Sequence, residues 1–213
     1  EPLVSITGLT FVSSKSNNDK KLIIPEKING HNVERIACSA FCKNEYIEKV
    51  VLPDTIKYIE RNAFQESSVK SVHLGKNIEQ IGPSAFEKCH NLIDINLPEG
   101  LKTISRGAFM DCNSLTDIVF PDSLVSLGGS VFDCCSSLRS IHIGANLINI
   151  GYSKDTDFAF GAYNLEKITV SPLNKCYRVE KDILYNTYEN FLMKVFNNSA
   201  QKDVVVPKWV AGV

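Results

Sequence analysis

The chain has 213 residues, of which 44% are hydrophobic and 22% are charged, and its formal net charge at pH 7 is -1. A near-neutral chain has no global field that would attract nucleic acid or an anionic membrane surface. No apolar run approaches the roughly 20 residues that a membrane-spanning helix needs. We therefore expect a folded protein that binds no nucleic acid and does not insert into a membrane, with a substantial core.

The first part of the chain, residues 1–21, predicts a cap for the structure that follows. Residues 3–12 read LVSITGLTFV, which favours a strand or hairpin, and residues 13–21 read as a polar turn. A stack of repeated units needs such a cap, because the terminal unit otherwise exposes its inner face.

From residue 22 onward the chain repeats a pattern with a period of about 23 residues. A small residue followed by phenylalanine anchors each repeat, at Phe41, Phe64, Phe86, Phe109, Phe132 and Phe160. Further along each repeat, two apolar residues flank a variable one, as in Val72 and Leu74. This alternation predicts a short strand, and the fixed period predicts a solenoid of stacked coils.

The two sides of each coil are expected to differ. The strands should pair in parallel with their equivalents, about 4.8 Å away in the next coil. Pro53, Pro98 and Pro121 directly follow three of the strands and should end them, since proline cannot donate to the ladder. The Ala-Phe segment predicts a tight helical turn on the opposite side, with phenylalanine filling the space between the two walls.

Residues 78–98, IEQIGPSAFEKCHNLIDINLP, resemble the BspA-type leucine-rich repeat, whose pattern is close to I-x-x-I-G-x-x-A-F-x-x-C-x-x-L-x-x-I-x-[IL]-P. The matching positions are Ile78, Ile81, Gly82, Ala85, Phe86, Cys89, Leu92, Ile95, Leu97 and Pro98. The resemblance covers roughly residues 22–213. It implies an α/β repeat solenoid: a right-handed leucine-rich-repeat coil with a parallel sheet on its concave face and short helical turns on its convex face. It also implies an extracellular or cell-surface location and a role in adhesion or binding.

Departures from the pattern are few, and we expect them to alter local packing without breaking a coil. They are Val131 for alanine, Gly75 and Gly144 for proline, and Asn44, Ser67 and Tyr163 for cysteine.

The C-terminal part departs further from the repeat. Residues 176–196 look like the hairpin that often interrupts such arrays, with strands at residues 183–185 and 191–196. Residues 204–213 begin another repeat, which favours an array that continues past Val213. Aromatic residues form either the core of the hairpin or an exposed patch that binds a glycan or protein. They are Tyr177, Tyr185, Tyr188, Phe191, Phe196 and Trp209.

The candidate ligand-binding residues are those expected to face outward from the parallel sheet. They are Lys49, Val51, Ser71, His73, Asp94, Asn96, Asp117, Val119, Ser140, His142, Lys167 and Thr169. Variable side chains on a rigid repeat scaffold suit recognition. We predict a non-enzymatic surface or secreted module that binds a protein or glycan on a host or neighbouring cell, without a cofactor or metal. A structural spacer and the targeting domain of an enzyme are the alternatives.

Two pairs within this set could suggest chemistry. His73 and His142 are three strands apart, about 14 Å, so they cannot share a metal ion. Asp94 and Asp117 should lie on adjacent strands about 5 Å apart, a spacing that suits a cation site or a retaining glycosidase. We expect a solvated carboxylate pair instead, because an open sheet cannot exclude water.

Seven cysteines occur in the chain, and three of them, Cys89, Cys112 and Cys135, occupy one repeat position. A metal or disulfide ladder is one interpretation. We expect small buried apolar residues instead, because equivalent side chains point in parallel, which is poor disulfide geometry. The other cysteines match no standard zinc spacing. They are Cys38, Cys42, Cys134 and Cys176.

Overall fold

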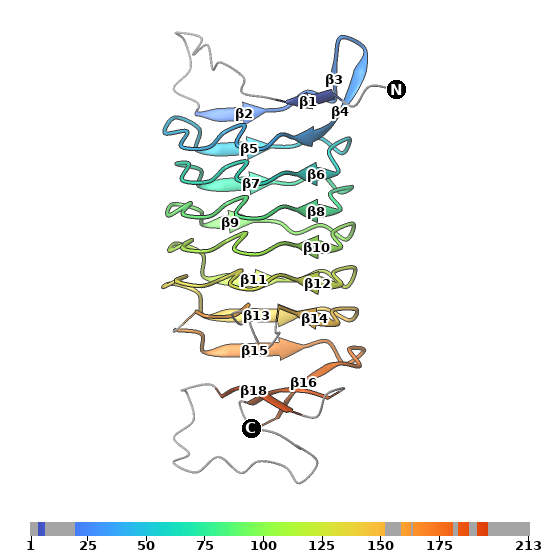
Figure 1. Cartoon of the computed structure of the whole chain (residues 1–213), viewed down its shortest axis with the longest axis vertical. Helices are drawn as coiled ribbons and strands as arrows, with labels where there is room; N and C mark the ends of the chain where they lie inside the picture. The colour runs from blue at the N-terminus through green and yellow to red at the C-terminus, as the bar shows by residue number, and fades with distance from the viewer. Residues whose placement is uncertain are drawn as a thin grey trace.

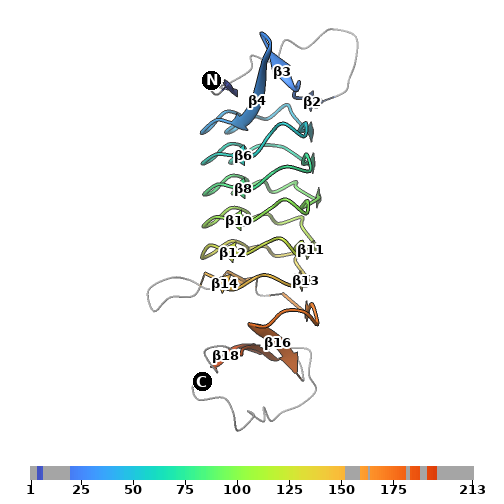
Figure 2. The same cartoon turned by 90° about the vertical axis from the view of Figure 1, so that its right-hand side faces the viewer.

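The computed structural model describes residues 4–6, 20–151, 159–162, 164–180, 183–187 and 191–195. These residues form a stack of β-strand coils, with β2 and β4 near one end and β16 and β18 at the other (Figure 1). Most coils contribute one strand to each of two parallel sheets, which run as two columns along a nearly straight stack (Figures 1 and 2). The fold is therefore a β-solenoid.

One sheet is unbroken along the stack, and we call it the continuous sheet. Its order is β1-β4-β6-β8-β10-β12-β14, with β3 paired antiparallel to β4. Its strands are β1 (Val4–Ile6), β3 (Lys27–Ile28), β4 (His31–Ile36), β6 (Tyr58–Ile59), β8 (Gln80–Ile81), β10 (Thr103–Ile104), β12 (Ser126–Leu127) and β14 (Asn149–Ile150). The sequence predicted only the strand within residues 3–12, where β1 lies; most of the other strands have two residues, too few to show alternation.

The second sheet contains the strands that the apolar alternation predicted, and we call it the interrupted sheet. Its strands are β2 (Lys21–Ile23), β5 (Lys49–Val51), β7 (Ser71–His73), β9 (Asp94–Ile95), β11 (Asp117–Val119), β13 (Ser140–Ile143) and β15 (Lys167–Val170). They pair in parallel with equivalent residues in register, as predicted. The exception is the step from β9 to β11, which divides the sheet into β2-β5-β7-β9 and β11-β13-β15.

The last described segment is a three-stranded antiparallel sheet of β16 (Tyr177–Glu180), β17 (Ile183–Asn186) and β18 (Phe191–Val195). The hairpin expected near 176–196 thus gains a third strand. Tyr177 and Tyr185 are buried, and the Tyr177 hydroxyl donates to the Ile148 carbonyl at 3.0 Å. These two rings therefore belong to the core. Tyr188, Phe196, Trp209 and the repeat expected at 204–213 lie outside the described residues.

The prediction of short helical turns, and with it the α/β class, is wrong: the described part of the chain forms no helix. In residues 84–88, alternate amides donate to carbonyls of the next coil at 2.8 to 3.0 Å. An α-helix needs those amides for bonds within its own segment. Ser84 and Lys88 also have φ of 53° and 58°, outside the right-handed helical region. None of the described segments could therefore span a bilayer as a helix.

The phenylalanine of each turn lies in the space between the two sheets. Phe41, Phe64, Phe86, Phe109 and Phe132 form a column of nearly parallel rings. Successive ring centroids are 5.1, 5.2, 5.4 and 5.6 Å apart. Offset stacking at this spacing is favourable for aromatic rings. The column therefore joins successive coils through the core.

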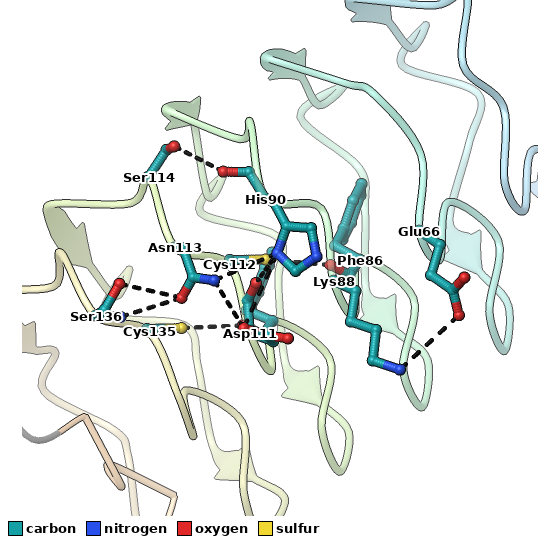
Figure 3. A network of polar contacts seen from close by, with 11 residues as sticks. Glu66, Phe86, Lys88, His90, Asp111, Cys112, Asn113, Ser114, Cys135 and Ser136 are labelled. Carbon is teal, nitrogen blue, oxygen red and sulfur yellow. Dashed lines mark hydrogen bonds and ion pairs between the residues drawn. The ribbon is translucent and has the colours of Figure 1, made fainter.

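The cysteines at the shared repeat position are buried and free, as expected for small core residues. Each thiol also donates to the carbonyl of the phenylalanine in the preceding coil. The distances are 3.0 Å for Cys89, 3.1 Å for Cys112 and 3.1 Å for Cys135; Figure 3 shows the bond from Cys112 to Phe86. Burial raises the pKa of Cys89 to about 11 and that of Cys135 to about 12. These thiols therefore stay protonated donors.

A groove at the break in the interrupted sheet

The candidate site is a groove where β9 and β11 fail to pair. Figure 1 shows these strands set further apart than β7 and β9, whereas the continuous sheet passes the same level evenly. The groove has a volume of about 490 Å³. Side chains of both strands line it, together with residues that follow each strand.

Glycine and proline at one repeat position explain why the coils separate here. A Cβ atom on Gly75 would lie 2.3 Å from the carbonyl oxygen of Pro53, and one on Gly144 would lie 2.5 Å from that of Pro121. Close stacking therefore leaves no room for a side chain at residue 75 or residue 144. Pro98 is followed in the next coil by Pro121 instead of glycine, and we infer that the ring of Pro121 keeps its coil from approaching as closely.

The earlier pair of successive prolines, Pro25 and Pro53, does not break the sheet. Strands β2 and β5, which precede them, pair over three residues. After Pro25, however, the chain enters β3, whereas a turn follows each of the other prolines at this position. We infer that the conflict arises where proline follows proline and a turn follows both, as at Pro98 and Pro121.

Asn96 marks where the ladder between β7 and β9 ends. In two other coils the equivalent amide donates to a backbone carbonyl of the next strand, at 2.9 Å from Leu52 and 3.0 Å from Phe120. Here the Leu74 amide donates instead to Asn96 Oδ1 at 2.8 Å, and Asn96 Nδ2 donates back to the Leu74 carbonyl at 3.2 Å. The side-chain amide of Asn96 thus takes the place of the backbone partner that Leu74 would have in a regular ladder. Asn96 is exposed, as predicted for an outward-facing residue, and its side-chain amide also binds the neighbouring coil.

The break leaves two strand edges facing each other. In a parallel ladder, alternate residues of a strand bond to opposite neighbours. The Asp94 amide donates to the coil of β7, so the backbone amides and carbonyls of Ile95 and Leu97 point toward β11. On the other wall, the backbone groups of Ile118 and Phe120 bond toward β13. The backbone groups of Asp117 and Val119 therefore point toward β9. Among the residues that the structure describes, no strand pairs with these two edges.

The floor of the groove is apolar. Ile95 and Leu97 are only half-buried, whereas Val72 and Leu74, their equivalents in the preceding coil, are buried. Val119 on the opposite wall is 66% exposed. The break therefore exposes apolar surface that regular stacking would cover.

The rim of the groove is acidic. Asp94, Glu99, Asp117 and Asp122 line it, and no lysine or arginine does so. Hydrogen bonds from Ser140 and then Thr116 hold the pKa of Asp117 below its usual range. Asp117 is therefore ionised at neutral pH, and an acidic rim of this kind favours a cationic ligand.

The structure places eleven of the twelve predicted residues in two ladders, and Asn96 belongs to neither. Lys49, Ser71 and Asp94 align on one side of the break, as do Val51 and His73. On the other side Asp117, Ser140 and Lys167 align, as do Val119, His142 and Thr169. The groove brings together five of the twelve and leaves out the other seven. The five are Asp94, Asn96, Asp117, Val119 and His142.

The expected spacing of Asp94 and Asp117 assumed that their strands pair, and this assumption is wrong. The two carboxylates lie across the groove instead. His142 is half-buried, with Nδ1 2.8 Å from Thr169 Oγ1. Within the described residues, no group of three or more histidine, cysteine or acidic side chains is placed to hold a metal ion.

Sequence reasoning missed the rest of the groove. The missed residues are Ile95, Leu97, Glu99, Phe120, Pro121 and Asp122. The available signal was the succession of Pro98 and Pro121 without an intervening glycine, read together with the glycines at positions 75 and 144.

A second polar cluster lies on the turns, and none of its residues belongs to the groove lining (Figure 3). The Asn113 amide donates to the Asp111 carboxylate at 2.8 Å and lies 3.3 Å from His90 Nδ1. The Ser114 hydroxyl donates to the His90 carbonyl at 2.6 Å, and the Ser136 hydroxyl donates to Asn113 Oδ1 at 3.2 Å. Most of these bonds join neighbouring coils, so we interpret the cluster as structural.

Comparison with known proteins agrees with this architecture. Residues 34–157 match the BspA type Leucine rich repeat region in 6 copies. The crystal structure of the T. pallidum Leucine Rich Repeat protein (TpLRR) is similar, with 27% identity and a TM-score of 0.64 over 71% of this chain and 70% of that chain. A comparison with curated proteins gave no match.

Two further solved structures are similar over more of this chain. A leucine rich cell surface protein from Faecalibacterium prausnitzii has 25% identity and a TM-score of 0.62, covering 86% of this chain and 54% of that chain. A leucine-rich repeat protein from Eubacterium ventriosum shares the fold, with 23% identity and a TM-score of 0.74, covering 91% and 51%. The chain thus spans about half the length of these two proteins.

Proposed function

Because the chain belongs to the BspA-type leucine-rich repeat family, we propose that it is a non-enzymatic recognition module of the cell surface or the extracellular space. Its partner is a protein or glycan on a host or neighbouring cell. The description of the similar Faecalibacterium prausnitzii protein as a cell surface protein supports the location. The observation that carries the proposal is the groove at the break in the interrupted sheet.

The groove has the properties of a ligand site. Its volume of about 490 Å³ falls within the roughly 300 to 1,000 Å³ of ligand clefts. Apolar side chains form the floor and polar groups converge on the rim, a combination that provides both affinity and orientation. Because the coils around the groove are held by the continuous sheet and the phenylalanine column, the walls are preorganised for binding.

The chemistry of the groove favours binding over catalysis. A glycosidase needs one carboxylic acid whose pKa is raised so that it can donate a proton. The pKa of Asp117 is shifted the opposite way, by the Ser140 hydroxyl first and the Thr116 side chain second. Binding through the C-terminal aromatic residues is less well supported, since Tyr177 and Tyr185 are buried.

The test is binding of the purified chain to an array of extracellular matrix proteins and glycans. Val119→Lys places a bulky charge on the groove wall, and Leu173→Lys is its matched control, because the two side chains are 66% and 70% exposed. We expect Val119→Lys to weaken binding by about tenfold or more, as for a central interface position, and Leu173→Lys to have no effect.

Two outcomes would contradict the proposal. Equal loss in both variants would place recognition away from the groove. Failure of the unmodified chain to bind any protein or glycan would favour the structural spacer.

A further inference from the structure

We propose that the groove binds an extended segment of a partner protein in which lysine or arginine alternates with apolar residues, and that this segment pairs with the open edge of β9 or that of β11. The inference rests on the proposed recognition function and names the ligand class. Three features carry it: unpaired strand edges, an exposed apolar floor and an acidic rim.

The strand edges select an extended peptide. Unpaired backbone amides and carbonyls at the edge of a sheet accept a further strand, and this mode of recognition gives affinity through the main chain. The open edges are Ile95 and Leu97 on one wall and Asp117 and Val119 on the other. An edge of three residues such as β11 spans about 10 Å, which matches about three residues of an extended partner.

The floor and rim select the side chains of that peptide. In an extended segment, successive side chains point to opposite faces. Side chains facing inward would contact Ile95 and Leu97, which are exposed only because the sheet is broken. Side chains facing outward would lie near the carboxylates of Asp94 and Asp117. An alternating apolar and basic pattern satisfies both faces, and no lysine or arginine of the lining competes for the carboxylates.

The probe is a synthetic hexapeptide, VKVKVK, with both ends blocked. We expect saturable binding in calorimetry, weakened by about tenfold or more when alternate peptide amides are N-methylated, since this removes strand pairing. Replacing lysine by glutamate should weaken binding at least as much, because it places like charges at the rim. Binding should also slow hydrogen exchange of the amides of one edge, either Ile95 and Leu97 or Asp117 and Val119.

Two double variants, each of which removes two negative charges, separate the effect of the rim carboxylates on affinity from the effect of the net charge. Asp94→Asn with Asp117→Asn should weaken binding of the hexapeptide by about tenfold or more. Glu26→Gln with Glu45→Gln removes the same charge from exposed positions outside the groove lining and should leave the affinity unchanged. Far-ultraviolet circular dichroism and urea titration check that all variants are folded.

Several results would overturn the inference. Equal affinity for the N-methylated peptide would exclude strand pairing, and equal loss in both double variants would exclude the rim. The hexapeptide could fail to bind while a partner from the array binds the unmodified chain but not Val119→Lys. In that case the recognition function stands and the peptide class is wrong. Selective loss of a glycan in that experiment would assign the groove to carbohydrate instead.

Discussion

The continuous and interrupted sheets are built from the same repeat, yet only one of them is broken. The continuous sheet adjoins the Ala-Phe turns, whose alternate amides bond to the next coil and whose rings stack through the core. The interrupted sheet precedes positions that vary between proline and glycine. The fixed residues of the repeat thus set the spacing of the coils on one side. The variable residues can change that spacing on the other side without unfolding a coil.

This difference shows how a repeat protein can acquire a site. In a solenoid each coil contacts only its neighbours, so a local defect affects one step of the stack. The step between β9 and β11 loses the hydrogen bonds of one sheet but keeps the parallel pair of β10 and β12. The core beneath it is retained as well, since Phe109 and Phe132 stay stacked.

The largest effect on stability is expected from a substitution in the phenylalanine column, which joins the coils on the side of the continuous sheet. Phe86→Ala removes a fully buried ring stacked between two neighbours, at 5.2 and 5.4 Å. We expect a loss of about 3 to 5 kcal/mol in the free energy of unfolding, measured by urea denaturation. Val119→Ala, on the groove wall, should change it by less than about 0.5 kcal/mol. Similar values for the two variants would contradict the division of roles between the sides.

A smaller loss should follow from removing one thiol of the cysteine column. Cys112→Ala deletes a buried sulfur and its hydrogen bond to the Phe86 carbonyl. That carbonyl still accepts a hydrogen bond from the Cys89 amide. We therefore expect the free energy of unfolding, measured by urea denaturation, to fall by about 1 to 2 kcal/mol. Cys134→Ala, at an exposed thiol, is the control and should be close to neutral. An equal cost for both would mean that the hydrogen bond and burial contribute little.

The origin of the break can be tested at the proline itself. Pro121→Gly should allow its coil to approach Pro98 as Gly75 approaches Pro53. We expect β9 and β11 to pair, with hydrogen exchange of the Asp117 and Val119 amides slowed by about tenfold. The global free energy of unfolding should change by about 1 kcal/mol or less, because added glycine entropy opposes the new bonds. Unchanged exchange would show that the proline does not cause the break.

The smallest effect concerns charges on the interrupted sheet. Hydrogen bonds from Lys20 and then Lys70 lower the pKa of Glu48 from its ordinary 4.5 to about 2. Since the folded-state pKa is the lower one, the stabilisation is complete above pH 4.5 and is lost as the pH falls toward 2. Glu48→Gln should therefore reduce the fall in stability between these pH values, and added salt should reduce it further.

Urea titrations at several pH values would measure this effect. Glu45→Gln, at an exposed position, is the control. A pH dependence that is identical in the Glu48→Gln variant and the unmodified chain would contradict the assignment.

The sequence predicted the strands of the interrupted sheet well, because positions such as Val72 and Ile141 alternate with exposed residues and must be buried. It did not predict the form of the turns. Ser84 and Phe86 bond to a neighbouring coil, and such bonds are not visible in the local pattern that favours a helix. The groove was missed for a similar reason, since Pro98 and Pro121 conflict only when their coils are stacked.

The break also has a mechanical consequence. A force that pulls the ends of the solenoid apart loads the steps between coils in series, so the step with the fewest hydrogen bonds yields first. Among the described coils from β5 to β13, that step is the one between β9 and β11, where only one sheet and the turns remain bonded. Tension along the stack would therefore open the groove before it disrupts the other steps in this range, so in a protein attached to a surface such tension would act first on the groove that we propose for ligand binding.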